Sequence, residues 1–295
     1  MDEDRGVDDR DVDDVRTFPR DAFPLEAVVA AKGGRTVSVC VPAHNEAATV
    51  ARVVTAVRGP HAGAAGGSGL VDEVLVVDDG STDETAEAAT GAGARVVRLP
   101  RRVGKGGAMR AALEASAGDV LVFLDGDVEN TTDAFVTSLL GPLFRDAGDV
   151  ALVKGYYQRP IGDTPAGGGR VTELVAKPLL EVLFPEHPGL RSVLQPLAGE
   201  TAAPRRVLEK VGFAPGYGVE IGLLVDVVAR FGTGAVAQVD LGVRVHRNRT
   251  LDELRPQAAE VLRAALERAA LEEPTLEGVT LEGAAPPGVP GRPAR

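Results

Sequence analysis

The sequence predicts an α/β fold in which helices flank a mostly parallel sheet. Between residues 37 and 124, short apolar runs alternate with segments of helical periodicity. This alternation is typical of parallel strands joined by crossover helices. In addition, polar residues at 42–46, 78–81 and 125–127 directly follow apolar runs. Ligands bind beyond the carboxyl ends of the strands in such sheets, so these three segments mark a candidate site.

The first half of the chain contains the clearest strand and helix patterns. Short, apolar and β-branched runs predict strands at 37–41, 74–77, 95–98 and 120–124. Apolar residues at helical spacing predict helices at 46–57, 82–90 and 106–117. Residues 59–69 are rich in Gly and Ala and are predicted to form a surface loop.

The second half is less regular. Strands are predicted at 150–156 and 235–245, and helices at 204–211 and 219–231. A Gly/Pro-rich loop at 161–169 leads into a helix that begins near Val171 or Thr172. Thr250 and Glu253 have the spacing of a capping box, which predicts a helix that extends to about residue 271.

Length and charge favour one enlarged domain between two tails. The chain has 295 residues and a formal net charge of -11. Eight of the first fourteen residues are acidic, so residues 1–20 are predicted to be a disordered, solvated arm. Residues 272–295 are predicted to be a flexible tail. An acidic chain without a basic stripe argues against a nucleic-acid partner.

The composition indicates a reducing, aqueous environment. The single cysteine, Cys40, lies in an apolar run and is predicted to be buried and inert. No segment approaches the roughly 20 apolar residues of a membrane span, and the start lacks the pattern of a signal peptide. We therefore expect a cytoplasmic protein without a membrane partner.

The segment Asp125-Gly126-Asp127 is the most informative motif. Residues i and i+2 of an extended segment point to the same side, so the two carboxylates converge at the end of a buried strand. A hard divalent cation relieves their repulsion and also binds diphosphate oxygens. The alternative is an ordinary acidic turn. The position directly after an apolar strand favours the metal.

A second group of polar residues has the composition of a nucleotide site. Asp78 and Ser81 follow a strand, and Lys105 precedes a predicted helix. A cation in a loop before a helix is well placed to meet a nucleotide. The alternative for Ser81 is a helix cap, with Glu84 three residues later. The segment around Lys105 is not a P-loop, because the Walker spacing is absent.

Three residues of the second half are candidates with structural alternatives. Arg170 follows three glycines and precedes a predicted helix start, where a guanidinium and free N–H groups form an anion site. It could equally be a surface arginine. His246 could be a metal ligand or a structural histidine. Glu220 could contact a ligand or simply provide a favourable charge at a helix start.

Taken together, these motifs resemble a known family. Residues 41–46, 77–83, 104–106 and 125–127 are similar in order and spacing to the nucleotide-sugar half of GT-A glycosyltransferases, which have a Rossmann-like fold. Segments 168–174, 196–200, 216–222 and 245–248 resemble the actinobacterial glucosyl-3-phosphoglycerate synthases. The resemblance covers about residues 20–270. It implies a nucleotide-sugar-binding half at 21–150 and an acceptor-binding half at 151–271 of one domain.

The resemblance also implies an activity and a set of site residues. The family transfers glucose from UDP-glucose to the 2-hydroxyl of 3-phosphoglycerate with retention, using Mg²⁺ or Mn²⁺. The implied donor-binding residues are Pro42, Ala43, Glu46, Asp78, Ser81, Lys105 and Asp125. The implied metal ligands are Asp127 and His246, and the implied acceptor-binding residues are Gly169, Arg170, Thr172 and Asn248. Glu220 is expected to meet the glucose hydroxyls, and the Leu197 carbonyl to face the reacting centre.

Other functions stay open at this point. His44 stands where the family usually has an aliphatic residue, and Gly126 where it usually has serine. One alternative is a GT-A transferase with another donor or acceptor, such as GDP-mannose or a polyprenyl phosphate. Another is a non-catalytic nucleotide-sugar binder. A homodimer is also expected.

Overall fold

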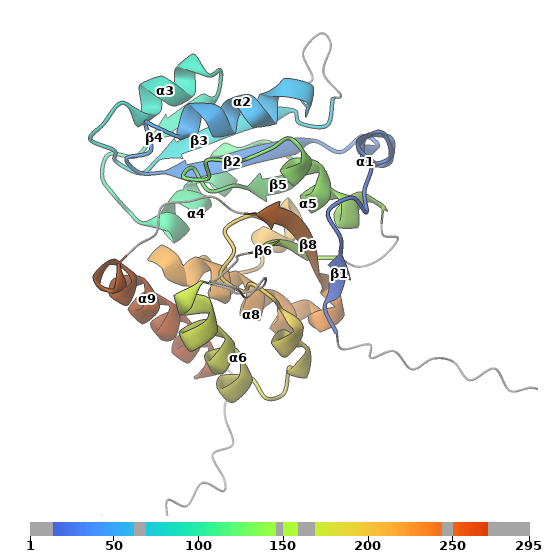
Figure 1. The fold of residues 1–295 in the computed structure, drawn as a ribbon, viewed down its shortest axis with the longest axis vertical. Helices are drawn as coiled ribbons and strands as arrows, with labels where there is room; N and C mark the ends of the chain where they lie inside the picture. The colour runs from blue at the N-terminus through green and yellow to red at the C-terminus, as the bar shows by residue number, and fades with distance from the viewer. Residues whose placement is uncertain (1–13, 62–68, 146–149, 159–168, 244–249, 271–295) are drawn as a thin grey trace, which may run out of the picture.

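A single mixed sheet runs through the protein. The computed structural model describes residues 14–61, 69–145, 150–158, 169–243 and 250–270. Within them, eight strands form one sheet in the order β1-β8-β6-β7-β5-β2-β3-β4 (Figure 1). The strands are β1 (Arg16–Phe18), β2 (Val37–Ala43), β3 (Glu73–Asp78), β4 (Arg95–Arg98), β5 (Val120–Phe123), β6 (Leu152–Gln158), β7 (Thr201–Pro204) and β8 (Val236–Val243). Their pairings are parallel, except that β7 is antiparallel to both β5 and β6.

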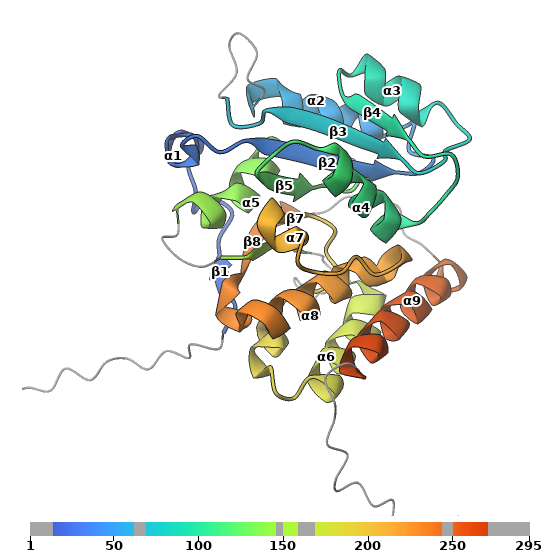
Figure 2. The same cartoon turned by 180° about the vertical axis from the view of Figure 1, so that it is seen from behind.

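Helices cover both faces of the sheet, which confirms the predicted fold class. One face packs against α1 (Leu25–Lys32), α2 (Val50–His61), α3 (Thr85–Gly91) and α5 (Ala134–Arg145). The other face packs against α4 (Lys105–Ala115), α6 (Lys177–Leu183), α7 (Arg205–Leu208), α8 (Val219–Phe231) and α9 (Leu251–Ala269) (Figures 1 and 2).

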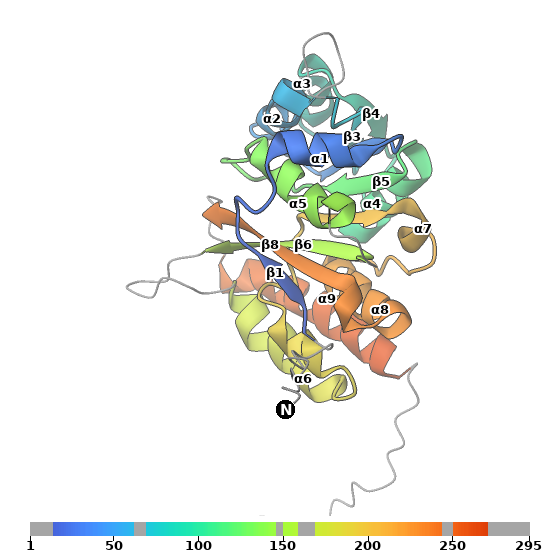
Figure 3. The same ribbon diagram turned by 90° about the vertical axis from the view of Figure 1, so that its right-hand side faces the viewer.

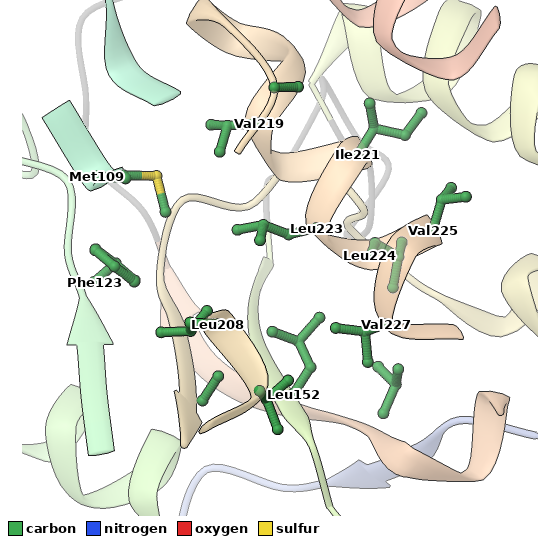
Figure 4. Close-up of a cluster of buried hydrophobic side chains, with 14 of the residues drawn as sticks. Met109, Phe123, Leu152, Leu208, Val219, Ile221, Leu223, Leu224, Val225 and Val227 are labelled. Atoms are coloured by element: carbon green, nitrogen blue, oxygen red, sulfur yellow. The ribbon is translucent and has the colours of Figure 1, made fainter. Parts of the chain in front are cut away.

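The two hydrophobic cores follow from the alternation of side chains along the strands. In β2, Val39 and Val41 belong to the core under α2 and α5, whereas Cys40 belongs to the core on the opposite face. Figure 4 shows this second core, where Met109 of α4 and Phe123 of β5 lie near the apolar residues of α8. Cys40 is free and buried as predicted, and burial raises the pKa of its thiol to about 12.

The strands of the first half are confirmed. Two of their helices, α2 and α3, begin four and three residues later than predicted, whereas α4 begins one residue earlier, at Lys105. The capping box is also confirmed, since the Thr250 hydroxyl accepts a hydrogen bond from the Glu253 N–H at the start of α9. The sequence analysis missed α1 and α5. The helix predicted at 204–211 was partly wrong, because Thr201–Pro204 is β7 and only Arg205–Leu208 is helical.

The predicted acidic arm of residues 1–20 was wrong at its carboxyl end. Arg16–Phe18 forms β1, which pairs with β8 at one edge of the sheet (Figure 3). The Val15 N–H also donates to the Ser192 hydroxyl at 3.1 Å. Backbone pairing and Val15 burial hold this segment, so the acidic charges before it do not prevent docking. Residues 1–13, the loop part 62–68 and the tail 271–295 lie outside the described residues.

Among the helices of the described part, none has the length and apolar character needed to cross a membrane.

Candidate active site

The candidate site lies at the carboxyl ends of the parallel strands β2, β3 and β5. Ala43 is the last residue of β2 and pairs in register with Asp78, the last residue of β3. Asp125 follows β5 by two residues. The structure therefore places the three predicted motifs at one edge of the sheet, as parallel pairing requires.

Backbone and side-chain hydrogen bonds join the ends of β2 and β3 to the start of α4. The Asp79 N–H donates to the Ala43 carbonyl at 2.8 Å. The buried Asp79 carboxylate accepts from the N–H groups of Val103 at 2.6 Å and Gly104 at 2.9 Å. Asp79 thus fixes the loop that presents Lys105.

The turn after β2 is held in a conformation that few residues adopt. Asn45 has a φ of 58°, in the left-handed region. Its N–H donates to the Ser81 hydroxyl at 2.9 Å, and its side-chain oxygen accepts from the Thr82 N–H at 2.9 Å. The alternative reading of Ser81 as a helix cap was wrong, because α3 begins at Thr85 and Glu84 occupies the cap position. Ser81 instead ties the two loops together.

Asp78 is buried at the end of β3 and stays ionised. Burial alone raises the pKa of this carboxyl, but hydrogen bonds from Ser81 and Arg98 outweigh burial and lower its pKa below the ordinary value. The carboxylate accepts from the Ser81 N–H at 2.9 Å and from Arg98 Nε at 3.2 Å.

Lys105 forms the centre of the site. Its Nζ lies 2.5 Å from Asp125 Oδ1 and 2.5 Å from Glu220 Oε1. The three side chains are mostly buried, with 15%, 15% and 6% exposure. They come from α4, the end of β5 and the start of α8, which are far apart in the sequence. The structure thus brings two predicted donor residues, Lys105 and Asp125, together with Glu220.

The position of Lys105 is explained by these carboxylates. A cation at the first residue of a helix opposes the helix dipole, so this placement needs a compensating partner. Burial also opposes the charge. The attraction and hydrogen bonds of Asp125 and Glu220 outweigh burial and raise the pKa of Lys105 above its ordinary value. The ammonium is therefore permanently protonated at neutral pH.

The segment 196–200 reaches the same point because β7 is antiparallel. The residues that precede an antiparallel strand lie at the carboxyl edge of its parallel neighbours. A Cβ atom added to Gly199 would lie 2.2 Å from Asp125 Oδ1 and 2.5 Å from Lys105 Nζ. The Gly199 backbone therefore rests on the Lys105–Asp125 pair. Leu197, two residues earlier, is partly exposed, whereas Ala198 and Gly199 are buried.

The loop before α8 is packed tightly against the start of α4. A Cβ on Gly106 would meet the Ala214 carbonyl oxygen at 1.9 Å. The Tyr217 N–H donates to Glu260 Oε2 of α9 at 2.7 Å. These contacts fix the position of Glu220, so α9 supports the site from outside.

Of the two predicted metal ligands, Asp127 belongs to the described residues. In the described residues, no group of three or more His, Cys, Asp or Glu side chains could hold a metal ion. Asp127 is partly exposed beside Asp125. His246 and Asn248 lie outside the described residues. The donor set nevertheless fits Mg²⁺ or Mn²⁺ bound jointly with a diphosphate, because such ions take one or two carboxylates and complete their shell with phosphate oxygens and water.

Three of the predicted acceptor residues, Gly169, Arg170 and Thr172, lie together on a separate segment. Gly169 directly precedes a helical turn that begins at Arg170 and continues as a π-helix, Thr172–Ala176, and then as α6. Arg170 is exposed and Thr172 is buried. The Glu173 N–H donates to the Gly169 carbonyl at 3.0 Å. A π-helix is rare and is frequently found at functional sites, which agrees with a binding role for this turn.

The sequence analysis missed three residues that shape the site. Asp79 positions the loop before α4, Gly199 permits the close approach of its segment, and Lys154 lies fully buried in β6. The lysine could have been noticed, because a charged residue inside the apolar run 150–156 requires a buried partner.

Comparison with known proteins identifies the family. A sequence profile of glycosyl transferase family 2 matches residues 38–174. The glucosyl-3-phosphoglycerate synthase of Mycolicibacterium smegmatis is 49% identical over 261 residues, which cover 85% of this chain and 83% of the relative. This chain belongs to the glucosyl-3-phosphoglycerate synthase family.

Solved structures of a family member agree with this fold. The glucosyl-3-phosphoglycerate synthase of Mycobacterium tuberculosis, in complex with Mn²⁺, UDP-glucose and phosphoglyceric acid, is 46% identical, with a TM-score of 0.78. The match covers 87% of this chain and 88% of that chain. Another structure of the same synthase contains Mg²⁺ and UDP, with a TM-score of 0.77 and 46% identity over 87% of each chain.

Proposed function

We propose that this protein moves glucose from UDP-glucose to the 2-hydroxyl of 3-phospho-D-glycerate, giving glucosyl-3-phosphoglycerate with retention of the anomeric configuration. Membership of the synthase family supports this assignment. The observation that carries it is the ion pairing of Lys105 with Asp125 and Glu220 at the carboxyl edge of the sheet. A buried cation held by two carboxylates provides both charge and hydrogen-bond acceptors for a nucleotide sugar.

In this proposal the donor occupies the loops after β2, β3 and β5. Pro42, Ala43 and Glu46 hold the uridine, and Ser81 and Lys105 contact the base. Asp78 binds the donor and also supports the Ser81 loop. Asp125 contacts the ribose and diphosphate region. The hydrogen bonds that join these loops support the proposal, because they preorganise the site before the donor binds.

The metal in this proposal is Mg²⁺ or Mn²⁺, held by Asp127 and His246. When bound, it neutralises the charge that develops on the departing UDP. Asp127→Ala is expected to abolish turnover, while Asp127→Asn leaves a trace. Full activity in an excess of chelator would contradict the metal.

The acceptor in this proposal binds at Gly169, Arg170, Thr172 and Asn248. The Arg170 guanidinium clamps an anionic group, and the adjoining helical turn offers further N–H groups. Glu220 meets the glucose hydroxyls, and the Leu197 carbonyl faces the anomeric carbon. Retention requires attack from the face of the departing diphosphate, so the diphosphate itself accepts the proton of the acceptor hydroxyl.

A donor-by-acceptor assay tests the function. Purified protein is supplied with UDP-glucose, GDP-glucose or GDP-mannose and with 3-phosphoglycerate or a polyprenyl phosphate, with and without Mg²⁺. We expect the highest kcat/KM for UDP-glucose with 3-phosphoglycerate, with GDP-glucose second. A higher kcat/KM for GDP-mannose, or transfer only to the lipid, would refute the assignment. Binding of UDP-glucose without any transfer would identify a non-catalytic binder.

The cytoplasmic location and the homodimer stay predictions from the sequence. Size-exclusion chromatography with light scattering tests the dimer directly.

A further inference from the structure

The strand β6 contains a fully buried lysine that belongs to neither the proposed donor site nor the proposed acceptor site. Lys154 has 2% exposure and lies in register with Thr201 of β7 and Gln238 of β8. Lysine is almost never fully buried without a partner, since desolvation of an ammonium is costly. The contacts of Lys154 therefore indicate what retains it.

The Lys154 ammonium fastens the segment that leads into β7. Its Nζ donates to the Ala198 carbonyl at 2.9 Å and to the Thr201 hydroxyl at 3.5 Å. The backbone ladder between the two strands ends close by, where the Gly155 N–H donates to the Glu200 carbonyl at 2.8 Å. Lys154 thus holds the chain beyond the end of the ladder.

A second buried side chain holds the other end of the same segment. Gln195 Nε2 donates to the Tyr157 carbonyl of β6 at 2.6 Å. Residues 196–199 therefore form a turn between two anchors, both on β6. At the tip of this turn, Leu197 is partly exposed and Gly199 lies against Lys105 and Asp125.

We infer that Lys154 is a positioning residue for glucosyl transfer: its ammonium fixes the Ala198 carbonyl and thereby the turn 197–199 against the Lys105–Asp125 pair. This inference rests on the proposed function, in which the Leu197 carbonyl faces the anomeric carbon. A displacement of about 1 Å in a group at the reacting centre lowers the rate roughly 100-fold. An anchor one residue away from that carbonyl therefore affects turnover more than binding.

The charges around Lys154 make its role dependent on pH. Four charged side chains shift the pKa of Lys154 electrostatically: Glu220 of α8, Lys105 of α4, Glu200 before β7 and Asp125 after β5. Burial and the repulsion of Lys105 outweigh the attraction of the carboxylates, and the pKa of Lys154 is lowered to about 8. The ammonium is protonated at neutral pH and loses its proton as the pH rises past that value.

The same shift predicts a stability signature. The unfolded chain holds this proton up to a pH of about 10.4, whereas the folded protein loses it near pH 8. Between these values the unfolded state binds more protons, so this group makes the folded state more stable as the pH rises. Lys154→Met removes that rise.

The experiment compares Lys154→Met with Lys32→Met. Lys32 is the matched control, because it is also buried and its Nζ contacts the Gly69 carbonyl and Asp72, each at 2.6 Å. Those partners lie at the amino edge of the sheet, away from the site. The wild type is first assayed with UDP-glucose, Mg²⁺ and 3-phosphoglycerate. Absence of any transfer there would overturn the proposed function rather than the role of Lys154.

In an active protein, we expect Lys154→Met to lower kcat at least ten-fold, while calorimetry gives a UDP affinity within about three-fold of wild type. Wild type and Lys32→Met should lose kcat above pH 8, whereas the residual kcat of Lys154→Met should not. A kcat within two-fold of wild type, or an unchanged pH profile, would overturn the inference. Should Lys154→Met not fold, the wild-type profile decides, and a constant kcat from pH 7 to 9.5 overturns it.

Discussion

The two edges of the sheet use charged side chains in different ways. At the amino edge, each carboxylate accepts hydrogen bonds from several protein groups. Asp72 accepts from Lys32 and from the Val37 N–H. Glu73 accepts from Ser38, Arg95 and the Ala117 N–H. At the carboxyl edge, two carboxylates share the Lys105 ammonium. The first arrangement stabilises the fold by joining neighbouring strands and loops. The second places side chains of three distant elements around one point, where a ligand can replace part of their contacts.

The largest difference is expected from removal of the central cation. Lys105→Met leaves the carboxylates of Asp125 and Glu220 side by side with one partner fewer. Breaking a buried ion pair in this way costs about 3–5 kcal/mol of unfolding free energy. We expect kcat/KM for UDP-glucose to fall by about 100-fold or more. Removal of one group that stabilises charge in the transition state commonly lowers the rate by about that factor. Chemical denaturation and steady-state kinetics measure the two effects.

Arg205→Met is the control for this variant. Arg205 donates to the carbonyls of Leu113, Ser116 and Gly118 at the amino edge, at 2.7–2.8 Å. Its loss should lower stability by about 1–3 kcal/mol with little change in kcat at 25 °C. Equal effects of the two variants on kcat would contradict the view that only the carboxyl edge takes part in catalysis.

Two glycines, each too crowded for a Cβ atom, sharpen the comparison. A Cβ at Gly199 would meet Asp125 at 2.2 Å, and one at Gly118 would meet the Ser38 backbone nitrogen at 2.5 Å. Both alanine variants should lower the melting temperature. Only Gly199→Ala should also lower kcat, by about 10-fold, since it displaces the turn 197–199. A similar loss of kcat in Gly118→Ala would show that general distortion, not the turn, controls activity.

Arg170→Ala tests whether the acceptor element is independent of the donor edge. Hydrogen bonds to charged groups contribute about 1.5–3 kcal/mol each, so kcat/KM for 3-phosphoglycerate should fall at least about ten-fold. Calorimetry should give an unchanged affinity for UDP-glucose. Lys177→Ala, which removes an exposed ion pair with Glu173 on the same element, is the control with little effect. A collapse of donor affinity in Arg170→Ala would assign Arg170 to the donor site instead.

The smallest effect concerns the amino edge at low pH. Burial raises the pKa of Glu73, but hydrogen bonds from Ser38, Arg95 and Ala117 outweigh it and lower the pKa below its ordinary value. The stability from this carboxylate is present above its unfolded pKa of about 4.3 and is lost as the pH falls through the lower folded value. Glu73→Gln should therefore show a smaller fall in melting temperature between pH 7 and 3, with kcat at pH 7 unchanged. If the melting temperature of Glu73→Gln fell between pH 7 and 3 as much as that of the wild type, Glu73 would not be a source of acid sensitivity.

Much of the donor side could be predicted from the sequence. The runs of β-branched residues identify β2, β3 and β5, and parallel pairing alone requires that Ala43, Asp78 and Asp125 end at one edge. The capping box at Thr250 was equally local, because its two hydrogen bonds link residues three apart. Such features depend on neighbouring residues, and the chain specifies them wherever the rest of the fold lies.

The three-dimensional fold decided the remaining features. The three residues of β1 and the four of β7 are too short for a recognisable pattern, and their strand state comes from pairing with β8, β5 and β6. Only the reversed direction of β7 delivers Gly199 to Lys105. The contacts of Lys105 with Glu220 and of Lys154 with Ala198 join residues 115 and 44 positions apart. Charge compensation across such separations depends on which elements pack together, and the local sequence carries no record of it.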